Sequence, residues 1–293
     1  ILLSPVTLLA SLWLKIVSHS NDKTMPLTQK IFSLVKVFPI RDHYYQPLVF
    51  PKLHLKHSLR EDRKLPGINM NINEQLDLLK QFNFNDELSA ISIDFENELS
   101  FYYNNGAFQS GDAEFLYNII RLKKPKRIIE IGSGMSTLMA INAVNKNKKE
   151  DNNYVCEHIC IEPFEMPWLE KTNVKVVRKL VEEVDLTLFE TLEKNDILFI
   201  DSSHMITPQG DVLTAFSSII PVMTSGVLIH IHDIFTPKDY LDEWILTEHR
   251  LWNEQYLLEA FLSFNSDFRI IGALNYLQHN YRKEIHAVSP ILA

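Results

Sequence analysis

The stretch RIIEIGSGMSTLMA, residues 127–140, runs from a short apolar segment through two closely spaced glycines into a segment with helical spacing. The β-branched residues before the glycines predict a buried strand, and the residues from Ser136 onward predict a helix. The chain has only eight glycines, and four of them, Gly106, Gly111, Gly132 and Gly134, fall between residues 106 and 134. Such a cluster indicates backbone that turns tightly or approaches a ligand closely.

Apolar segments and segments of helical spacing alternate from about residue 112 onward. Strands are predicted at 127–131, 154–161, 174–181, 196–200 and 226–231, and helices at 112–124, 136–149, 184–194 and 210–220. This alternation is typical of βαβ units, so the sequence predicts a doubly wound, mostly parallel, Rossmann-like α/β sheet. Near the end of the chain, residues 252–264 predict a helix and residues 268–275 a strand-like segment.

Residues 1–104 show no such alternation and are predicted to form an N-terminal helical and irregular extension, or cap, on an α/β domain at 105–293. The apolar residues 1–17 fall short of the roughly 20 that span a bilayer. No basic segment precedes them as in a secretory signal. Two interpretations stay open: a helix packed on the protein or on a second subunit of a homo-oligomer, and a helix at a membrane surface.

The composition excludes several classes of function. A net charge of -8 argues against nucleic-acid binding, which depends on Lys and Arg side chains that neutralise phosphates. Cys156 and Cys160, the only cysteines, lack the second ligand pair of a structural zinc site. Since no disulfide framework is present, we expect a cytoplasmic protein, with membrane association as the alternative that residues 1–17 leave open.

The glycine turn departs from the pattern of a dinucleotide site. In such a site, G-x-G-x-x-G places a pyrophosphate at the start of a helix. Here Thr137 stands where the third glycine would be, and Ser136 begins the helix. Glu130, just before the turn, would repel a phosphate and suits a ligand with a cationic amine.

Polar residues also follow the other predicted strands. Glu162 ends the second strand and could bind both hydroxyls of a ribose. Asp201, followed closely by His204, ends the fourth, and His232 and Asp233 end the fifth, where His230 and His232 share one face. The carboxyl ends of parallel strands form the ligand-binding edge of open α/β sheets, so we expect these residues to line a single cleft.

With these residues assembled, the chain resembles the class I S-adenosylmethionine-dependent methyltransferases over roughly residues 105–280. EIGSGMS matches their first motif, IEP their ribose-binding acid, and DILFIDSSH and LIHIHDIF their fourth and fifth strands. Within the class, the chain is similar to the branch of macrocin O-methyltransferase and of the enzymes named cephalosporin hydroxylases, which use a divalent metal.

The resemblance implies a role for each matching position. The cofactor S-adenosylmethionine would lie on the turn, with its ribose on the strand-end acid and its adenine against an aromatic ring; the residues are Glu130, Gly132, Ser133, Gly134, Ser136, Glu162 and Phe164. A metal such as Mg²⁺ would bind to Asp201, His232 and Asp233, although the branch commonly has an acid where this chain has His232.

The implied reaction is methyl transfer to a hydroxyl of a small or glycosidic metabolite. A metal on Asp201 would lower the pKa of that hydroxyl, and His204 would accept its proton. For His204, a solvated loop position and a supporting role beside the site are the alternatives. Two other functions stay open: an NAD-dependent oxidoreductase, against which Thr137 counts, and a non-catalytic module that keeps the methyltransferase fold in a biosynthetic complex.

Overall fold

A five-stranded parallel sheet forms the centre of the computed structural model, which describes residues 3–20, 23–43, 45–164 and 166–292. The strands are β1 (Arg127–Ile131), β2 (Glu157–Ile161), β3 (Lys175–Val177), β4 (Ile197–Ile200) and β5 (Leu228–Ile231). Their order is β3-β2-β1-β4-β5, and every neighbouring pair is parallel. The order reverses between β1 and β4, the point at which open α/β sheets bind ligands. The predicted doubly wound α/β fold is therefore confirmed.

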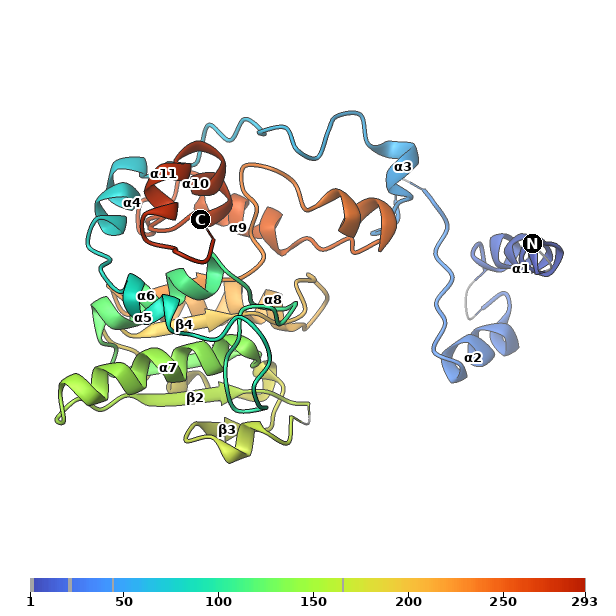
Figure 1. Ribbon diagram of the computed structural model, residues 1–293. Coiled ribbons are helices and arrows are strands. Elements are labelled where there is room, and N and C mark those ends of the chain that lie inside the picture. The colour runs from blue at the N-terminus through green and yellow to red at the C-terminus, as the bar shows by residue number, and fades with distance from the viewer. Residues whose placement is uncertain (1–2, 21–22, 44, 165, 293) are drawn as a thin grey trace. The chain divides into compact units, whose positions relative to one another are not determined.

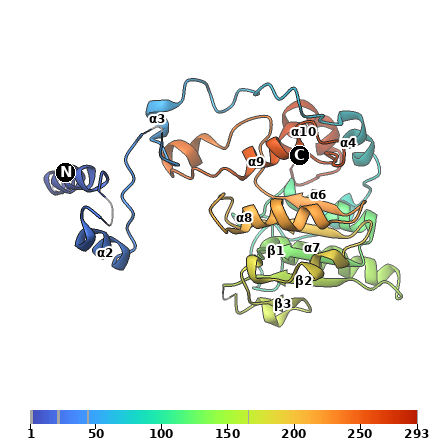
Figure 2. The same ribbon diagram turned by 180° about the vertical axis from the view of Figure 1, so that it is seen from behind.

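Helices cover both faces of this sheet (Figures 1 and 2). On one face, α6 (Asp112–Lys123) and α7 (Met135–Glu150) pack over Ile128, Ile197 and Phe199. On the other, α8 (Asp211–Thr214) and the helical turns after it pack over Ile129 and Leu198. Alternate residues of each strand thus enter opposite cores, which explains why the strands read as unbroken apolar runs.

Several elements are shorter or wound differently than predicted. β2 begins at Glu157, later than predicted. β3 ends at Val177, and a 3₁₀ turn already starts at Val181. The predicted helix at 184–194 is a 3₁₀ helix, Leu186–Thr191, whose first turn is capped by Asp185. The predicted helix at 210–220 is α8 followed by a π turn, Ala215–Ile219, and a 3₁₀ turn, Ile220–Val222. Pro221 cannot donate a backbone hydrogen bond, which helps to end the α-helical pattern there.

The segment 268–275 is not a strand. Its apolar side chains pack individually, with Phe268 against one core and Ile271 against the other, so they need no sheet ladder for burial. The segment follows α9 (Glu254–Leu262), which lies within the predicted helix at 252–264, and runs into α10 (Leu274–Asn280). The remaining helical elements of this region are α4 (Ile72–Leu79), α5 (Asn85–Ser89), α11 (Arg282–His286) and the 3₁₀ turns Leu169–Lys171 and Val181–Glu183.

The chain divides into two compact units, and the division does not follow the boundary predicted after residue 104. One unit comprises residues 61–240 and 252–293, and the other 1–60 and 241–251. Residues 61–104 belong with the sheet because their apolar side chains enter the core that contains α6; among them are Leu79, Phe82 and Leu88. The N-terminal unit of the structure thus comprises residues 1–60 together with residues 241–251.

The smaller unit contains helices α1 (Ser4–Val17), α2 (Pro26–Leu34) and α3 (Pro51–His54) and a π turn, Glu243–Thr247. The helix expected within residues 1–17 is thus present as α1. Among the described residues, no helix has the length and apolar character required to cross a bilayer.

Arg121 joins three helices of the larger unit through a buried network. Its guanidinium donates to Glu87 of α5 through Nε (2.8 Å) and Nη2 (2.9 Å), and it also contacts Asn147 and Glu150 of α7. The Arg121 side chain is 1% exposed and that of Glu87 22%, whereas that of Glu150 is 51% exposed. Glu87 is shielded from water together with Arg121, whereas Glu150 is largely solvated. Glu87 is therefore the more important counter-ion of Arg121.

Replacing Glu87 by Gln should lower the free energy of unfolding by about 3 kcal/mol, since Arg121 would stay buried without its main counter-ion. The matched variant Glu150→Gln should cost less than about 1 kcal/mol, because water screens that carboxylate. Urea denaturation at neutral pH measures both values. Equal losses for the two variants would contradict the assignment.

The same pair should make stability depend on pH in acid. Burial raises the pKa of Glu87, but hydrogen bonds from Arg121 and Tyr117 outweigh it, so the pKa in the folded protein is lowered. The stabilisation is therefore present above the unfolded-state pKa, about 4.3, and is lost as the pH falls through the lower folded-state value. The stability gap between wild type and Glu87→Gln should shrink below about pH 4, and a constant gap in acid urea titrations would contradict this.

Candidate active site

The glycine turn after β1 is held tightly against the end of β4. Gly132 has φ +82°, and a Cβ at this position would lie 1.8 Å from the backbone oxygen of Asp201. The Gly132 amide donates to Ile161 of β2 (3.0 Å), and the Asp201 amide donates to Ile131 of β1 (2.9 Å). Only glycine fits here, both in conformation and in space. A Cβ at Gly134 would meet nothing within 4 Å, so the backbone beyond the turn borders open space.

Glu130 lies buried behind this turn. Its carboxylate accepts hydrogen bonds from Thr137 Oγ1 (2.5 Å) and Cys160 Sγ (3.4 Å), and His158 Nε2 lies 3.3 Å away. Thr137 also accepts from the amide of Gly134 (3.2 Å). Burial, and then the nearby Glu130 charge, raise the pKa of the Cys160 thiol, which therefore stays a proton donor. Glu130 thus supports the turn from within, and Thr137, at the place of the third glycine, connects it to α7.

Glu162, at the end of β2, links the glycine turn to the next loop. Its two oxygens accept from the amides of Ser133 (3.1 Å) and Phe164 (3.0 Å). Arg178 donates to the backbone oxygen of Glu162 (3.0 Å) and also to that of Phe164. The structure therefore brings Ser133, Glu162 and Phe164 together, with the Phe164 side chain exposed. Ser136, the other predicted cofactor residue in this region, is buried in the first turn of α7.

Asp201, His204 and Asp233 gather where β4 and β5 end. His204 Nε2 lies 3.2 Å from Asp201 Oδ1 and 3.5 Å from Asp233 Oδ2. One ligand atom from each of the three residues lies within 4.8 Å of the other two, as metal ligands must. His232 is adjacent, with Nε2 3.6 Å from Asp233 Oδ1. The three-residue set thus contains His204, and His232 of the predicted set lies beside it.

His204 is fixed by a helix that is distant in the sequence. Its Nδ1 lies 2.9 Å from Glu254 Oε2, and its ring lies 4.3 Å from that of Trp252. Its backbone oxygen accepts from the amides of Asn253 (3.1 Å) and Glu254 (3.2 Å) at the start of α9. His204 is buried, so it is not a solvated loop residue. No strand-end pattern predicts the contact of Glu254 with His204, because Glu254 lies in a helix far along the chain.

The carboxylates around His204 control its charge. Burial lowers the pKa of His204, but hydrogen bonds to Asp201 and Glu254 outweigh it and raise the pKa to about 10. Conversely, burial raises the pKa of Asp201, while the hydrogen bond to His204 and nearby His232 lower it below its usual value. With Asp201 and Glu254 beside it, the imidazole is therefore a cation between carboxylates.

A small cavity lies next to this group. Its volume is about 170 Å³, and its lining includes Asp112, His232, Asp233, Asn275 and Gln278. Burial raises the pKa of Asp112, and the charges of Asp233 and Asp201 add to this effect against that of His232. In the sequence, Asp112 stands out only as the first residue of a predicted helix, because no motif connects it with residues so far along the chain.

The His230 ring packs against the core residue Phe199 and does not line the cavity. Its ring centre lies 4.4 Å from that of Phe199, and that of His232 lies 5.2 Å from Phe108. The two histidines share one face of β5, as the strand periodicity predicts. Burial, reinforced by His232, lowers the pKa of His230 to about 3, so its imidazole is neutral.

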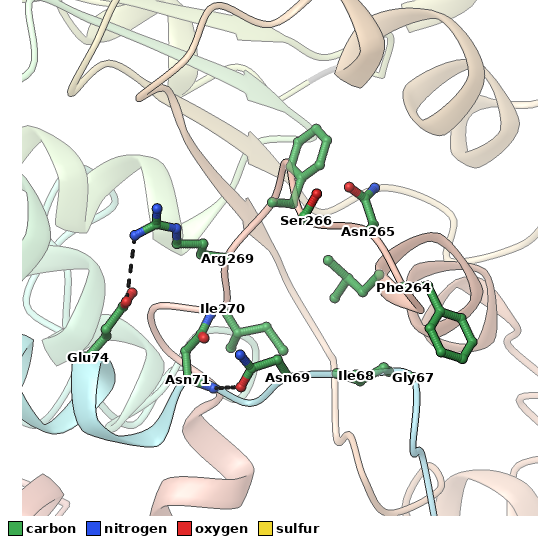
Figure 3. A pocket seen from close by; sticks show the side chains of 12 residues that line it. Gly67, Ile68, Asn69, Asn71, Glu74, Phe264, Asn265, Ser266, Arg269 and Ile270 are labelled. Carbon is green, nitrogen blue, oxygen red and sulfur yellow. Dashed lines mark hydrogen bonds and ion pairs between the residues drawn. The ribbon is translucent and has the colours of Figure 1, made fainter.

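A separate cavity of about 520 Å³ lies between the segments 67–74 and 262–270 (Figure 3). Figure 3 shows Arg269 directed toward Glu74, at 3.6 Å, and Asn69 beside Asn71. None of its lining residues belongs to the glycine turn or to the Asp201 group. This cavity is therefore a different site from the polar residues at the strand ends.

Comparison with known proteins gives a family for this arrangement. A protein of Archaeoglobus fulgidus described as uncharacterized is 34% identical over 187 residues, which make up 60% of this chain and 80% of that protein. Two solved structures are also similar. A methyltransferase of Podospora anserina bound to S-adenosylhomocysteine (SAH) is 15% identical over 66% of this chain and 77% of its own, with a TM-score of 0.34. A protein-L-isoaspartate O-methyltransferase of Plasmodium falciparum, also with SAH, is 17% identical over 55% and 77%, with a TM-score of 0.28.

The family match coincides with the carboxyl edge described above. Residues 129–234, from β1 through the end of β5, match the model of a methyltransferase domain. This range contains the glycine turn, Glu162 and the group formed by Asp201, His204 and Asp233. The chain therefore belongs to the same family as the archaeal protein, and the part of it that contains the sheet matches a methyltransferase domain.

Proposed function

We propose that this protein transfers the methyl group of S-adenosylmethionine to a hydroxyl oxygen of a small or glycosidic acceptor, with the help of a divalent cation. The observation that supports this most is the convergence of Asp201, His204 and Asp233 directly beside the Gly132 turn. Cofactor turn and polar group are thereby close enough to act on one pair of reactants.

The turn fits the cofactor. The open space at Gly134 lets a ligand approach the backbone closely, and Ser133 and Glu162 are linked at its rim. Each carboxylate oxygen of Glu162 accepts one amide hydrogen bond and can accept another from a ribose hydroxyl. Phe164 offers an exposed ring for the adenine. Glu130, being buried, would act on the methionine part only through the turn that it supports.

The polar group fits a cation. Two carboxylates and an imidazole with partly exposed oxygens suit Mg²⁺, Mn²⁺ or Fe²⁺. We assign Asp201 and Asp233 as ligands with His232 as the third, because His204 is held in the orientation that a base needs. A bound cation would lower the pKa of the acceptor hydroxyl as a Lewis acid.

A cation bound to Asp201 and Asp233 would offset the charge that raises the pKa of His204, so that His204 would be neutral and would accept the proton of that hydroxyl at Nε2. Its Nδ1 faces Glu254, which fixes the proton on this nitrogen and leaves Nε2 to act as the acceptor. Trp252 packs on the ring and limits its rotation. The acceptor would enter through the cavity that Asp112 and Asp233 line, since Asp233 also lies beside His204.

The alternatives have less support. Thr137 and the match to a methyltransferase domain both count against an NAD-dependent oxidoreductase. A non-catalytic module would not need the Asp201 group, so loss of that group would leave its role unchanged.

Replacing Asp201 or Asp233 by Asn should weaken Mn²⁺ binding at least about 100-fold, since each change removes a charged ligand. Electron paramagnetic resonance of Mn²⁺ measures the affinity, and calorimetry with SAH should show cofactor binding within about threefold of wild type because these side chains do not build the turn. Asp77→Asn, an exposed carboxylate paired with Lys80, is the control and should change neither. Unchanged Mn²⁺ affinity in both site variants would refute the metal assignment.

The two histidines can be separated by the same measurement. His232→Gln should weaken Mn²⁺ binding about tenfold or more, whereas His204→Gln should leave the Mn²⁺ affinity near that of wild type and abolish SAH formation with hydroxyl-bearing acceptors. If instead His204→Gln weakens Mn²⁺ binding and His232→Gln does not, His204 is the ligand and the base lies elsewhere.

Gly132 and Gly134 should respond differently to Ala. Gly132→Ala should lower both the melting temperature and SAH affinity, because its Cβ would collide with the Asp201 carbonyl. Gly134→Ala should keep the melting temperature but lower SAH affinity about tenfold or more, since a methyl group would occupy the space that the cofactor needs. Thermal shift and calorimetry measure both effects, with NAD as the control ligand, which should not raise the melting temperature of any variant. Full SAH affinity in Gly134→Ala would show that the cofactor does not approach this turn.

A further inference from the structure

Most of the large apolar side chains of α1 and α2 are exposed. On α1, Leu9 is 69% exposed, Leu12 51% and Trp13 50%, and Val17 is its only buried residue. On α2, which has no buried residue, Leu27 and Leu34 are 76% and 81% exposed. Extended apolar surfaces of this kind mark sites of interaction with a protein or a membrane.

The pattern of polar residues on α1 defines how the helix meets its partner. Ser4, Thr7, Ser11 and Lys15 recur at intervals of three and four and therefore form one narrow stripe along the helix. The rest of the circumference is apolar, and Trp13 lies within it. A helix with one polar stripe facing water and a broad apolar face suits the boundary between lipid headgroups and acyl chains, where Trp is enriched.

α2 repeats this arrangement in a shorter form. Leu27, Ile31 and Leu34 follow one another at helical spacing and are all exposed, with the exposed Lys30 next to them. Gln29 donates to Ser20 (2.9 Å), the hydrogen bond that connects α2 to the end of α1. The two helices thus offer apolar residues and cations from one connected segment.

Charge indicates which lipid surface fits. Residues 1–60 contain eight basic and two acidic residues, a net charge of +6, whereas the whole chain carries -8. Lys15, Lys30 and Lys36 are exposed among the apolar residues of this segment. A basic segment attached to an acidic protein is attracted to anionic lipids while the rest of the chain is repelled.

We propose that α1 and α2 bind to the surface of an anionic lipid bilayer, with Leu9, Trp13 and Leu27 among the inserted side chains and Lys30 and Lys36 near the headgroups. Binding of this kind does not depend on methyl transfer, so its test is independent of the proposed function.

Flotation of the full chain with lipid vesicles tests the proposal. The wild type should float with vesicles of phosphatidylcholine and phosphatidylserine, and high salt should reduce its binding about tenfold because salt screens headgroup attraction. The double variant Leu9→Glu, Trp13→Glu should stay at the bottom, and Lys30→Glu, Lys36→Glu should bind at least about tenfold more weakly. Val155→Glu, which changes an exposed apolar residue of the other unit, should float like wild type.

Unchanged melting temperatures would show that the α1 variants fold, as expected for exposed positions. The proposal is overturned if wild type does not float, if the Glu variants of α1 float equally well, or if phosphatidylcholine alone binds as strongly. It is also overturned if sedimentation velocity shows that α1 instead pairs two copies of the chain and that the Leu9→Glu, Trp13→Glu variant is a monomer without any change in flotation.

Discussion

The close contact between Gly132 and the backbone carbonyl of Asp201 is the constraint on which the site depends. β1 and β4 are neighbours although two strands, β2 and β3, separate them in the chain, and Ile131 pairs in register with Ile200. The residues that follow each strand must therefore share the same small space. Because no side chain fits between them at Gly132, the backbone of the glycine turn lies directly against the residue that starts the polar group. The order of the strands alone therefore brings the turn and the polar group together.

Buried polar groups then fix both the glycine turn and the group around Asp201. Behind the turn, Glu130 binds to Thr137 of α7 and to Cys160 of β2, so helix and strands meet at one carboxylate. Beyond β4, Asp201 and Glu254 bind to the two nitrogens of His204. Polar groups buried at this depth are stable only when they are hydrogen-bonded, and their partners consequently fix their orientation. The hydrogen bonds that these buried groups make therefore also fix the arrangement of the site.

The sequence was sufficient to predict the sheet and the strand-end residues, because both follow from local patterns. Apolar runs identified β1, β4 and β5, and parallel strands necessarily bring Glu162, Asp201 and Asp233 to one edge. Local patterns failed where tertiary packing decided the outcome. The periodicity at 184–194 is apolar enough for a helix but winds as 3₁₀, and the apolar residues of 268–275 are buried in two cores without joining the sheet. Asp112 and Glu254 could not be assigned to the site, because each reaches it only through the fold.

His204 shows why the sequence alone does not predict such a contact. Its backbone, at φ +58°, directs its carbonyl to the first amides of α9, which have no partners within their own helix. The same residue presents its imidazole to the carboxylate of Glu254, one of the two residues whose amides bind to its carbonyl. The loop after β4 and the start of α9 are thus joined twice through one residue, by backbone and by side chain. A displacement of α9 would move the imidazole together with its carbonyl, so the orientation of Nε2 toward Asp201 and Asp233 depends on a helix that no strand-end motif includes.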